Sequence, residues 1–217
     1  MLSERDLQSK IIEMRPWGHE ILLPYGLVTA RPPYHEESYP GEKNCQEYKP
    51  NGKYVKLEKA GAFEGVELPG WDPLSVLTRV LDLGCGGGWF SIHFAQKGFS
   101  VLAVDQSSKA IEKLEFLKEI LDLPKIRTQC REVGKATWVQ AGKYNIIMML
   151  GLLHHLPEED LPNLIRCCHY ALNRDGVLVI ETKPEVPCEE LLTQAKFVPR
   201  KLRGAPRSSW RGEKKHG

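Results

Sequence analysis

One stretch, VLDLGCGGGWFSIHFA at residues 80–95, constrains the fold of this chain more than any other. It places four glycines in five positions, between an apolar run and an apolar, helix-like segment. Glycine loses more conformational freedom on folding than other residues, so a fixed cluster of glycines requires a reason. Either the turn is only a tight connection, or a ligand approaches its backbone too closely for a Cβ. In both cases the sequence predicts a strand, a turn and a helix in succession.

Strand-like and helix-like segments alternate after residue 75. The expected strands are residues 76–83, 100–105, 125–130, 144–150 and 177–182, and the expected helices are residues 88–98, 107–121, 159–172 and 188–195. Asp175 and Gly176 form the expected turn before the last of these strands. Strands that alternate with helices and are apolar throughout indicate a parallel sheet covered on both faces. We therefore expect an α/β fold with a doubly wound, mostly parallel, Rossmann-like sheet.

The composition divides the chain into three segments. Residues 1–75, an N-terminal extension, are rich in proline and aromatic residues, with one hairpin expected at residues 19–29. Residues 76–195 form the expected ligand-binding core. Residues 196–217 form a basic tail, which carries eight Lys or Arg side chains against one Glu.

The bulk properties indicate an ordinary globular protein. The net charge of +2, from 30 basic and 28 acidic residues, creates no global field that would favour nucleic acid or membrane. The first residues lack the pattern of a signal peptide and no run of about 18 apolar residues occurs, so we expect a cytoplasmic protein with no membrane contact. Six cysteines without a C-x-x-C pair predict reduced thiols and no metal site. The oligomeric state has no signature in the sequence.

The spacing of the turn and two acidic residues point to the class of ligand. Ligands of doubly wound sheets bind beyond the carboxyl ends of the strands. The turn reads D-x-G-x-G-x-G, and Trp89 occupies the place of the third glycine of the dinucleotide fingerprint, which argues against NAD. Asp82 suits a cationic amino group, and Asp105 can accept hydrogen bonds from two ribose hydroxyls. An amino acid portion, a ribose and no phosphate together describe S-adenosylmethionine.

The segment VLDLGCGGGWFSIHFAQKGFSVLAVDQS resembles motif I and the following acidic motif of the class I SAM-dependent methyltransferases. YNIIMMLGLLHHLPEEDLPNLIRCCHYALNRDGVLVIET is similar to their fourth and fifth strands, so the resemblance covers about residues 76–182. It implies a seven-strand sheet with a reversed final strand. It also implies a set of cofactor-binding positions: Asp82, Gly84, Cys85, Gly86 and Gly88 at the methionine part, Asp105 at the ribose, Gln106 and Gly134 at the adenine, and Leu150 after strand four.

A more limited resemblance concerns the bacterial tRNA wobble-uridine carboxymethyltransferases. LGLLHHLP is similar to the end of their fourth strand, and PWGHEILLPYGLVT is similar to their entry segment. That group uses a carboxylated SAM, and His154 stands here in place of a tyrosine that helps to hold the extra carboxylate. The resemblance therefore bears on the subfamily only.

The C-terminus departs from the family pattern. Only 35 residues follow the fifth expected strand, and KFVPRKL is the one plausible further strand, interrupted by Pro199. We therefore expect the reversed strand to be missing, truncated or supplied by the N-terminal segment.

The resemblance implies methyl transfer to an oxygen or nitrogen of an acceptor, most simply a small molecule. Methyl transfer mainly requires that the nucleophile is positioned, and a base, if one is needed, would be His155 or His19, with His35 as a further candidate. Because substrate-choosing parts of this family often lie outside the core, the resemblance also implies that residues 1–75 fold over the pocket as a lid. Trp17, Tyr25 and Tyr34 would line this lid or merely pack it onto the sheet. Two alternatives stay open: an RNA-modifying methyltransferase that uses the basic tail, and a non-catalytic SAM-binding domain that regulates a partner.

Overall fold

The computed structural model describes residues 18–23, 26–31, 52–66, 79–134, 141–205 and 207–214. The chain forms two units, Met1–Gly52 and Lys53–Gly217. In the first unit, β1 (Gly18–Leu23) and β2 (Gly26–Arg31) pair antiparallel, with Leu23 opposite Gly26. This pairing confirms the predicted hairpin. Trp17, Tyr25, Tyr34 and His35, which we expected in the lid, lie outside the described residues.

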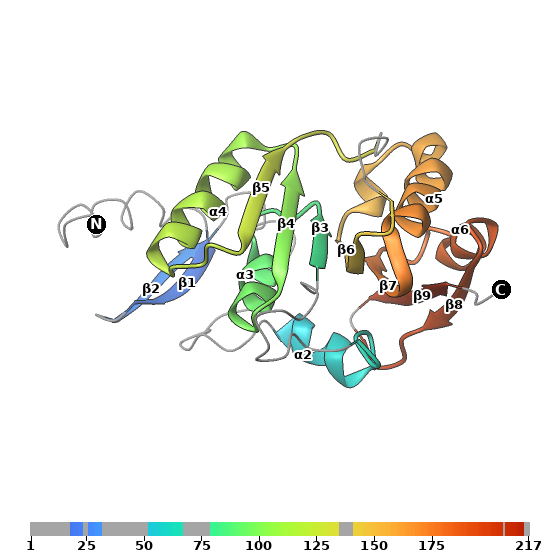
Figure 1. Ribbon diagram of the computed structural model, residues 1–217, viewed down its shortest axis with the longest axis horizontal. Coiled ribbons are helices and arrows are strands. Elements are labelled where there is room, and N and C mark those ends of the chain that lie inside the picture. Colours follow the sequence, from blue (N-terminus) through green and yellow to red (C-terminus); the bar gives the residue numbers. More distant parts are fainter. Residues whose placement is uncertain are drawn as a thin grey trace. The chain divides into compact units, whose positions relative to one another are not determined.

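The second unit is built on one seven-stranded sheet with the strand order β5-β4-β3-β6-β7-β9-β8. Its strands are β3 (Arg79–Leu83), β4 (Ser100–Asp105), β5 (Ile126–Cys130), β6 (Tyr144–Leu150), β7 (Leu172–Thr182), β8 (Phe197–Lys201) and β9 (Ser208–Lys214). The strands from β3 to β7 are parallel, so their carboxyl ends lie along one border of the sheet, which we call the carboxyl edge. The arrowheads of β4 and β5 point toward it in Figure 1. The doubly wound, mostly parallel sheet is confirmed.

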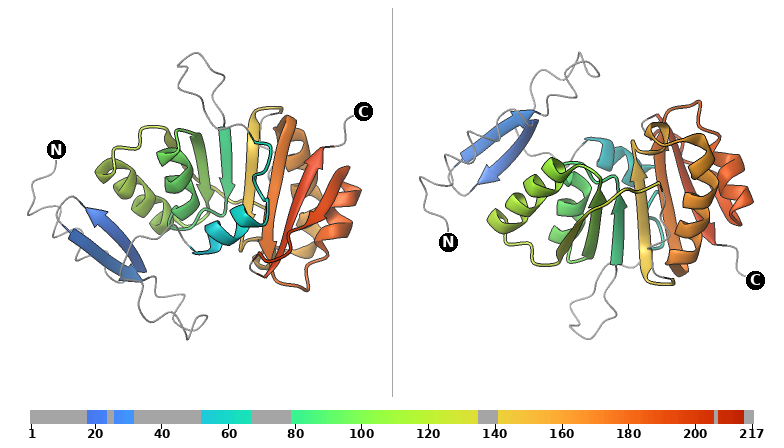
Figure 2. Two further views of the ribbon diagram at one scale, coloured as in Figure 1. Left: turned by 90° about the horizontal axis from the view of Figure 1, so that it is seen from below. Right: turned by 90° about the horizontal axis from the view of Figure 1, so that it is seen from above.

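Helices cover both sides of this sheet (Figure 2). They are α2 (Gly52–Lys59), α3 (Trp89–Gln96), α4 (Ser108–Ile120), α5 (Leu161–Ala171) and α6 (Cys188–Gln194), with short 3-10 turns η3 (Leu153–His155) and η4 (Glu158–Asp160) after β6. The buried side chains of α5 and α6 form one apolar cluster with Leu81 and Leu83 of β3. Helix α3 lies on the opposite face, because it contacts Asp82, whose side chain alternates with those two.

Strand β7 begins earlier than the sequence predicts. The expected turn at Asp175 and Gly176 lies inside the strand, where its pairing with β6 shifts register between Tyr144 and Ile146. A Cβ at Gly176 would lie 2.9 Å from the backbone oxygen of Tyr144 and 2.8 Å from a methyl carbon of Leu172. The turn-like dipeptide therefore marks an irregularity within one strand rather than a chain reversal.

The C-terminal segment, which we expected as a basic tail, contributes two strands to the sheet, Phe197–Lys201 and Ser208–Lys214. Strand β9 lies between β7 and β8 and is antiparallel to both, so the reversed final strand is present and comes from residues 208–214. It is neither missing nor supplied by the N-terminal segment. Pro199 is compatible with β8 because β8 is an edge strand, where a missing N–H breaks no ladder.

Two arginines tie the turn after α2 to these last strands. Arg211 of β9 is buried and donates from Nη1 to the backbone oxygens of Gly61 at 3.0 Å and Glu64 at 2.7 Å. Arg200 of β8 donates to the same Gly61 oxygen at 2.7 Å and pairs with the Glu64 carboxylate at 3.1 Å. The basic residues of this segment are thus partly structural, which the sequence alone could not show.

Candidate functional site

The glycine turn joins β3 to α3 at the carboxyl edge of the sheet. Gly84, Gly86 and Gly88 all have positive φ angles, of 70°, 51° and 83°. This left-handed region is costly for residues with a Cβ. The amides of Gly84 and Cys85 both donate to the Val104 oxygen, at 2.8 and 3.1 Å. The turn is therefore fastened to the neighbouring strand β4.

The three glycines serve different purposes. A Cβ at Gly84 would lie 2.8 Å from Leu152 Cδ1, and a Cβ at Gly88 would overlap Leu114 Cδ1. At Gly86 a Cβ would meet no atom of the described residues within 4 Å. Gly84 and Gly88 are therefore required by packing within the protein, and Gly86 alone presents bare backbone to open space.

Asp105 lies at the end of β4 and is coupled to the turn. Its Oδ2 accepts a hydrogen bond from the Gly86 amide at 2.8 Å, and its Oδ1 accepts one from the Ser107 amide at 2.9 Å. A carboxylate offers about four lone-pair sites, so two acceptor sites remain for a ligand. The side chain is partly exposed, and it can therefore both hold the turn and accept hydrogen bonds from two hydroxyls.

Asp82 has a more interior position than the sequence suggests. It is only 3% exposed, and its Oδ2 accepts a hydrogen bond from Ser91 Oγ of α3 at 2.7 Å. Burial raises the pKa of this carboxyl from its ordinary 3.8 to about 6. The hydrogen bond from Ser91 opposes that shift, and the nearby charge of Asp105 adds to it. Asp82 is thus an energetically costly carboxylate beneath the turn, and its contact with a cationic amino group stays a prediction.

The other expected cofactor positions border the same edge. Leu150 ends β6, and Gln106 follows β4 as an exposed residue whose backbone oxygen faces Cys130 Sγ at 3.5 Å. Cys85 lies in the turn, and burial raises the pKa of its thiol well above the usual range, which argues against a reactive thiolate.

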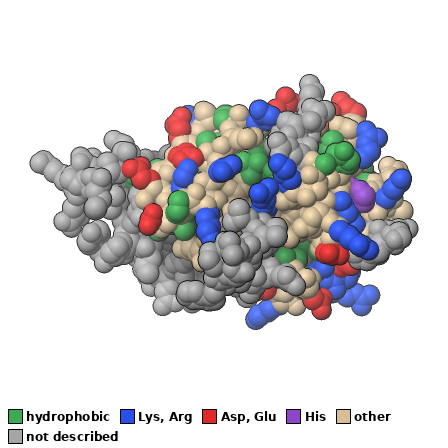
Figure 3. All heavy atoms as spheres, viewed as in Figure 1, with side chains coloured by type: hydrophobic (Ala, Val, Ile, Leu, Met, Phe, Trp, Pro, Cys, Tyr) green, Lys and Arg blue, Asp and Glu red, His purple; other side chains and the backbone are tan. Residues whose placement is uncertain are grey.

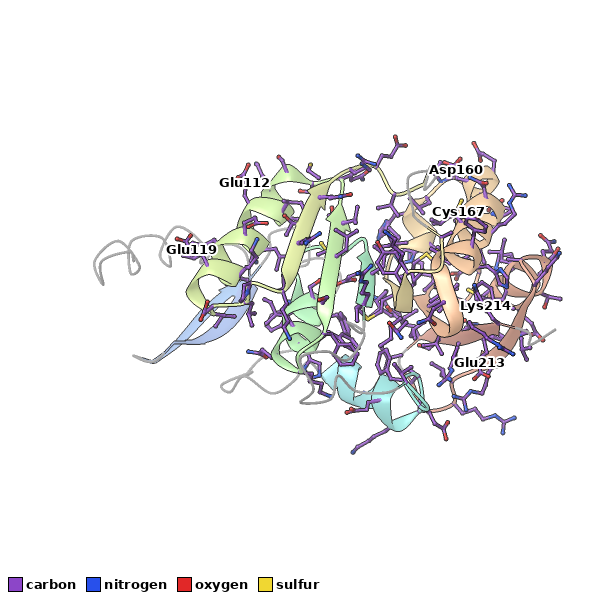
Figure 4. All side chains as sticks on the ribbon, in the orientation of Figure 1. Glu112, Glu119, Asp160, Cys167, Glu213 and Lys214 are labelled. Atoms are coloured by element: carbon purple, nitrogen blue, oxygen red, sulfur yellow. The ribbon has the colours of Figure 1, made fainter. Side chains whose placement is uncertain are left out.

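Asp160 is a neighbour of the site that sequence reasoning missed. A Cβ at Gly134 would lie 3.1 Å from Asp160 Oδ2. Asp160 ends η4, and Figure 4 shows it at the edge of the sheet toward which β5 points, far from Glu213 and Lys214. No spacing in the sequence connects residue 134 with residue 160, so only the fold brings this carboxylate to the expected adenine position.

A pair of histidines follows β6 on η3. The rings of His154 and His155 lie 4.1 Å apart, and His154 Nδ1 lies 3.1 Å from Thr182 Oγ1 at the end of β7. The buried Thr182 thus anchors His154, whereas His155 is exposed at the same edge. His19, the second candidate base, lies on β1 in the other unit, and the structure does not place its side chain.

An ion pair with a buried carboxylate, at the end of β7, was also missed by sequence reasoning. The Glu181 side chain is fully buried at the end of β7, and its Oε1 lies 3.5 Å from Nε of Arg207. Arg207 has a positive φ of 51° just before β9. The sequence could have revealed this ion pair only if β9 had been recognised as a strand. The antiparallel course of β9 brings residue 207 to the carboxyl end of β7.

The described residues contain no group of three or more His, Cys, Asp or Glu side chains placed to hold a metal ion. In the same ranges no helix is long and apolar enough to cross a membrane. These two observations concern only the part of the chain that the structure describes.

The fold is a doubly wound domain with a glycine-rich turn and a strand-end carboxylate at the carboxyl ends of its parallel strands. A family model described as methyltransferase domain matches residues 42–213. The ubiquinone biosynthesis O-methyltransferase of Bordetella avium is 31% identical over 104 residues, which span 48% of this chain and 42% of that protein. Its counterpart in Marinobacter nauticus is 26% identical over 156 residues, spanning 61% and 64%. The matches thus cover less than two thirds of these relatives.

Solved structures share the fold at low identity. A SAM-dependent methyltransferase from Methanosarcina mazei aligns with a TM-score of 0.51 and 17% identity over 65% of this chain and 94% of its own. A protein from Pyrococcus horikoshii aligns with a TM-score of 0.58 and 15% identity over 85% and 99%. The chain belongs to the methyltransferase domain family, within the class I SAM-dependent methyltransferases.

S-adenosylmethionine is the cofactor of this class, and the residues at the turn fit it. Gly86 leaves room for a ligand against its backbone, and Asp105 keeps acceptor capacity for two ribose hydroxyls after holding two amides.

Proposed function

We propose that this chain transfers a methyl group from S-adenosylmethionine to an oxygen or nitrogen nucleophile of a small molecule. The observation that carries the proposal is the pairing of Gly86, open on its ligand side, with Asp105, whose carboxylate is held by the Gly86 amide. The O-methyltransferase names of the curated relatives support an oxygen acceptor.

The cofactor, when bound, supplies an activated methyl group on a sulfonium, so the protein mainly has to bind and orient. The backbone from Gly84 to Gly88 would hold the methionine part and Asp105 the ribose. His155 is the proposed base, because it is exposed at the carboxyl edge next to a histidine that Thr182 anchors. It would accept the proton that the acceptor loses. His19 remains a second candidate for that proton.

The two rival functions differ in what they require. An RNA acceptor would need basic side chains interleaved with an accessible aromatic ring. Trp210 is only 9% exposed and donates from Nε1 to Ser208 Oγ at 3.0 Å, which favours a small-molecule acceptor. A non-catalytic SAM-binding domain would keep the turn but lack a proton acceptor at the carboxyl edge. A cytoplasmic location stays part of this proposal.

Two linked measurements test the proposal. Isothermal calorimetry of the purified full chain should show binding of S-adenosylhomocysteine and no binding of NAD. Radiolabelled methyl transfer into a cell extract, separated into metabolite, RNA and protein fractions, should then label metabolites. Binding of NAD instead, or label confined to RNA, would contradict the proposal. Cofactor binding without any transfer would favour the regulatory domain.

A further inference from the structure

The 3-10 turn η3 directs His155 to the side on which the glycine turn lies. The amide of His155 donates to the Leu152 oxygen at 2.9 Å, which closes a turn of three residues. Side chains three residues apart lie on the same side of such a turn, about 6 Å apart along its axis. The Leu152 side chain packs on the glycine turn, because a Cβ at Gly84 would lie 2.8 Å from Leu152 Cδ1. His155 therefore lies on the side of η3 that faces the backbone proposed to hold the cofactor.

Two residues inside η3 fasten it to the body of the sheet. Leu153 is fully buried in the apolar cluster to which α5 and α6 contribute. His154 is half-buried, and its Nδ1 lies 3.1 Å from Oγ1 of Thr182. Thr182 is fully buried at the end of β7 and lies on the same face of the sheet as Ile180 of that cluster. The ring of His154 is therefore held by a strand that is paired along both of its edges.

The rings of the two histidines are in contact. Their centroids lie 4.1 Å apart, and their planes are inclined to each other by 42°. His155 is exposed, and an exposed side chain ordinarily interconverts among several staggered rotamers. A neighbouring ring that is itself anchored restricts this choice. Among the described residues the His155 ring makes no hydrogen bond, so the stack with His154 is the contact that orders it.

An imidazole is well suited to take a proton at this edge near neutral pH. Figure 3 shows Asp and Glu side chains along the upper border of the face that it presents, where the carboxyl edge lies in Figure 1. The ordinary pKa of a carboxyl group is about 4, and that of an imidazole is about 6.5. A general base works best when its pKa lies close to the working pH. A neutral imidazole therefore accepts the proton of an acceptor more readily than an ordinary carboxylate does.

We propose that His154 is a positioning residue for methyl transfer: held by Thr182, its ring keeps the imidazole of His155 directed toward the acceptor. This inference rests on the proposed function and adds the residues that orient its base. In the step concerned, the acceptor oxygen forms a bond to the methyl carbon. The electron pair of the broken carbon–sulfur bond stays on sulfur, which becomes neutral. The hydroxyl proton passes to a ring nitrogen of His155, and the imidazolium then loses it to water.

The hydroxyl of Thr182 offers a direct test, because Thr182→Ser keeps it and Thr182→Val replaces it by a methyl group of similar size. The assay is transfer of a labelled methyl group from S-adenosylmethionine into the metabolite fraction of a fixed amount of cell extract. Thr182→Val should lower the maximal rate roughly ten- to hundredfold at an unchanged KM for S-adenosylmethionine, whereas Thr182→Ser should keep most of the rate. His155→Gln should lower it roughly a hundredfold or more. Glu158→Gln, at an exposed position, is the control and should not change it.

A measurement without any acceptor separates this inference from the proposed function. In ¹H–¹³C correlation spectra of the full chain with labelled histidine, the Cε1–H signal of His155 is identified by its loss in His155→Gln. Thr182→Val should move this signal toward the position of an unstructured histidine, because the stack with His154 loosens, and Thr182→Ser should not. Urea unfolding of each variant shows that it folds. If Thr182→Val does not fold, His154→Phe replaces it in the rate assay, since it keeps a ring but cannot bond to the hydroxyl.

Each outcome decides one of the two questions. If the unmodified chain transfers no methyl group, the proposed function fails, and the His155 signal alone decides whether His154 orients that ring. An unchanged His155 signal in Thr182→Val, or an unchanged maximal rate in a folded variant, would overturn the inference. A rate loss that appears only as a higher KM for S-adenosylmethionine would overturn it as well, because it would show that the variant disturbs the cofactor's turn through Leu152.

Discussion

Replacing Asp82 by Asn should raise the free energy of unfolding at neutral pH and weaken binding of the cofactor. Asp82 is almost fully buried beneath the glycine turn, where burial and the charge of Asp105 raise its pKa from 3.8 to about 6. Asn keeps an oxygen that can accept the Ser91 hydroxyl but carries no charge. The variant therefore removes a desolvation cost and keeps the local hydrogen bond.

The magnitude follows from the difference in pKa between the folded and unfolded chain. Below pH 4 the carboxyl is protonated in both states and costs nothing. Between pH 4 and pH 6 the folded state keeps its proton and the unfolded state loses it, so the free energy of unfolding falls as pH rises. The difference of about two pH units corresponds to roughly 3 kcal/mol above pH 6. A buried amide has its own cost of about 1 kcal/mol or more, so we expect a gain of about 1–2 kcal/mol.

Urea unfolding of the Asp82→Asn variant and the unmodified chain, measured from pH 4 to pH 8, checks this expectation. The stability difference should be near zero or negative at pH 4 and should grow to its full value by about pH 6.5. The exposed Asp122→Asn variant is the matched control and should show no such growth. A difference that does not vary with pH, or a variant that is destabilised at pH 7, would refute the argument from burial. Calorimetry with S-adenosylhomocysteine on the same samples shows whether the charge also attracts the amino group.

Three further expectations concern the turn and the last strands. Gly86→Asn should fold but lose binding of S-adenosylhomocysteine, measured by calorimetry, because the new side chain fills the open space at this position. Gly88→Ala should lower the free energy of unfolding by about 2–4 kcal/mol, measured by urea unfolding, because the new Cβ overlaps Leu114. Asp105→Asn should weaken cofactor binding by roughly tenfold or more, and faster amide exchange at residue 86 should reveal the lost tie to the turn. Arg211→Gln should lower the free energy of unfolding by about 2–4 kcal/mol and expose residues 60–66 to proteolysis. Equal cleavage of the variant and the unmodified protein would contradict this expectation.

The sheet from β3 to β7 was predictable because its strands are local apolar runs separated by helical periodicity. Strand β9 was not, because SSWRGEK reads as polar and basic. Its Arg211 is buried, and besides its ion pair with Glu213 it donates to the backbone oxygens of Gly61 and Glu64, about 150 residues away in the chain. A charged residue in a strand core becomes acceptable through such a partner, and no local pattern reveals one.

The same correction changes how the C-terminal segment can be tested. Deleting residues 203–217 removes β9, with Trp210, from between β7 and β8, so it would expose the core around Phe197. Cofactor binding is therefore not expected to survive that deletion, although the glycine turn lies far from it in sequence. Point substitutions at exposed positions of the segment are the appropriate test of any role in substrate capture.

The glycine turn was predicted in place but only partly for the right reason. The sequence attributes the cluster to a ligand, yet Gly84 and Gly88 are required by Leu152 and Leu114 of the protein itself. Leu152 precedes η3 and Leu114 lies on α4, so both side chains meet the turn only in the folded chain. Gly86 alone keeps the original explanation.

The carboxyl edge of the sheet thus divides into two halves that differ in how they are encoded. The half at β3 and β4 is built from backbone amides, left-handed glycines and one strand-end carboxylate, so it leaves a compact signature in a single stretch of sequence. The half at β6, β7 and β9 is built from side chains of separate segments: His155 follows β6, Glu181 ends β7, and the antiparallel return of β9 brings Arg207 to Glu181. The first half therefore points to the family from the sequence alone, whereas the second half becomes visible only in the folded chain.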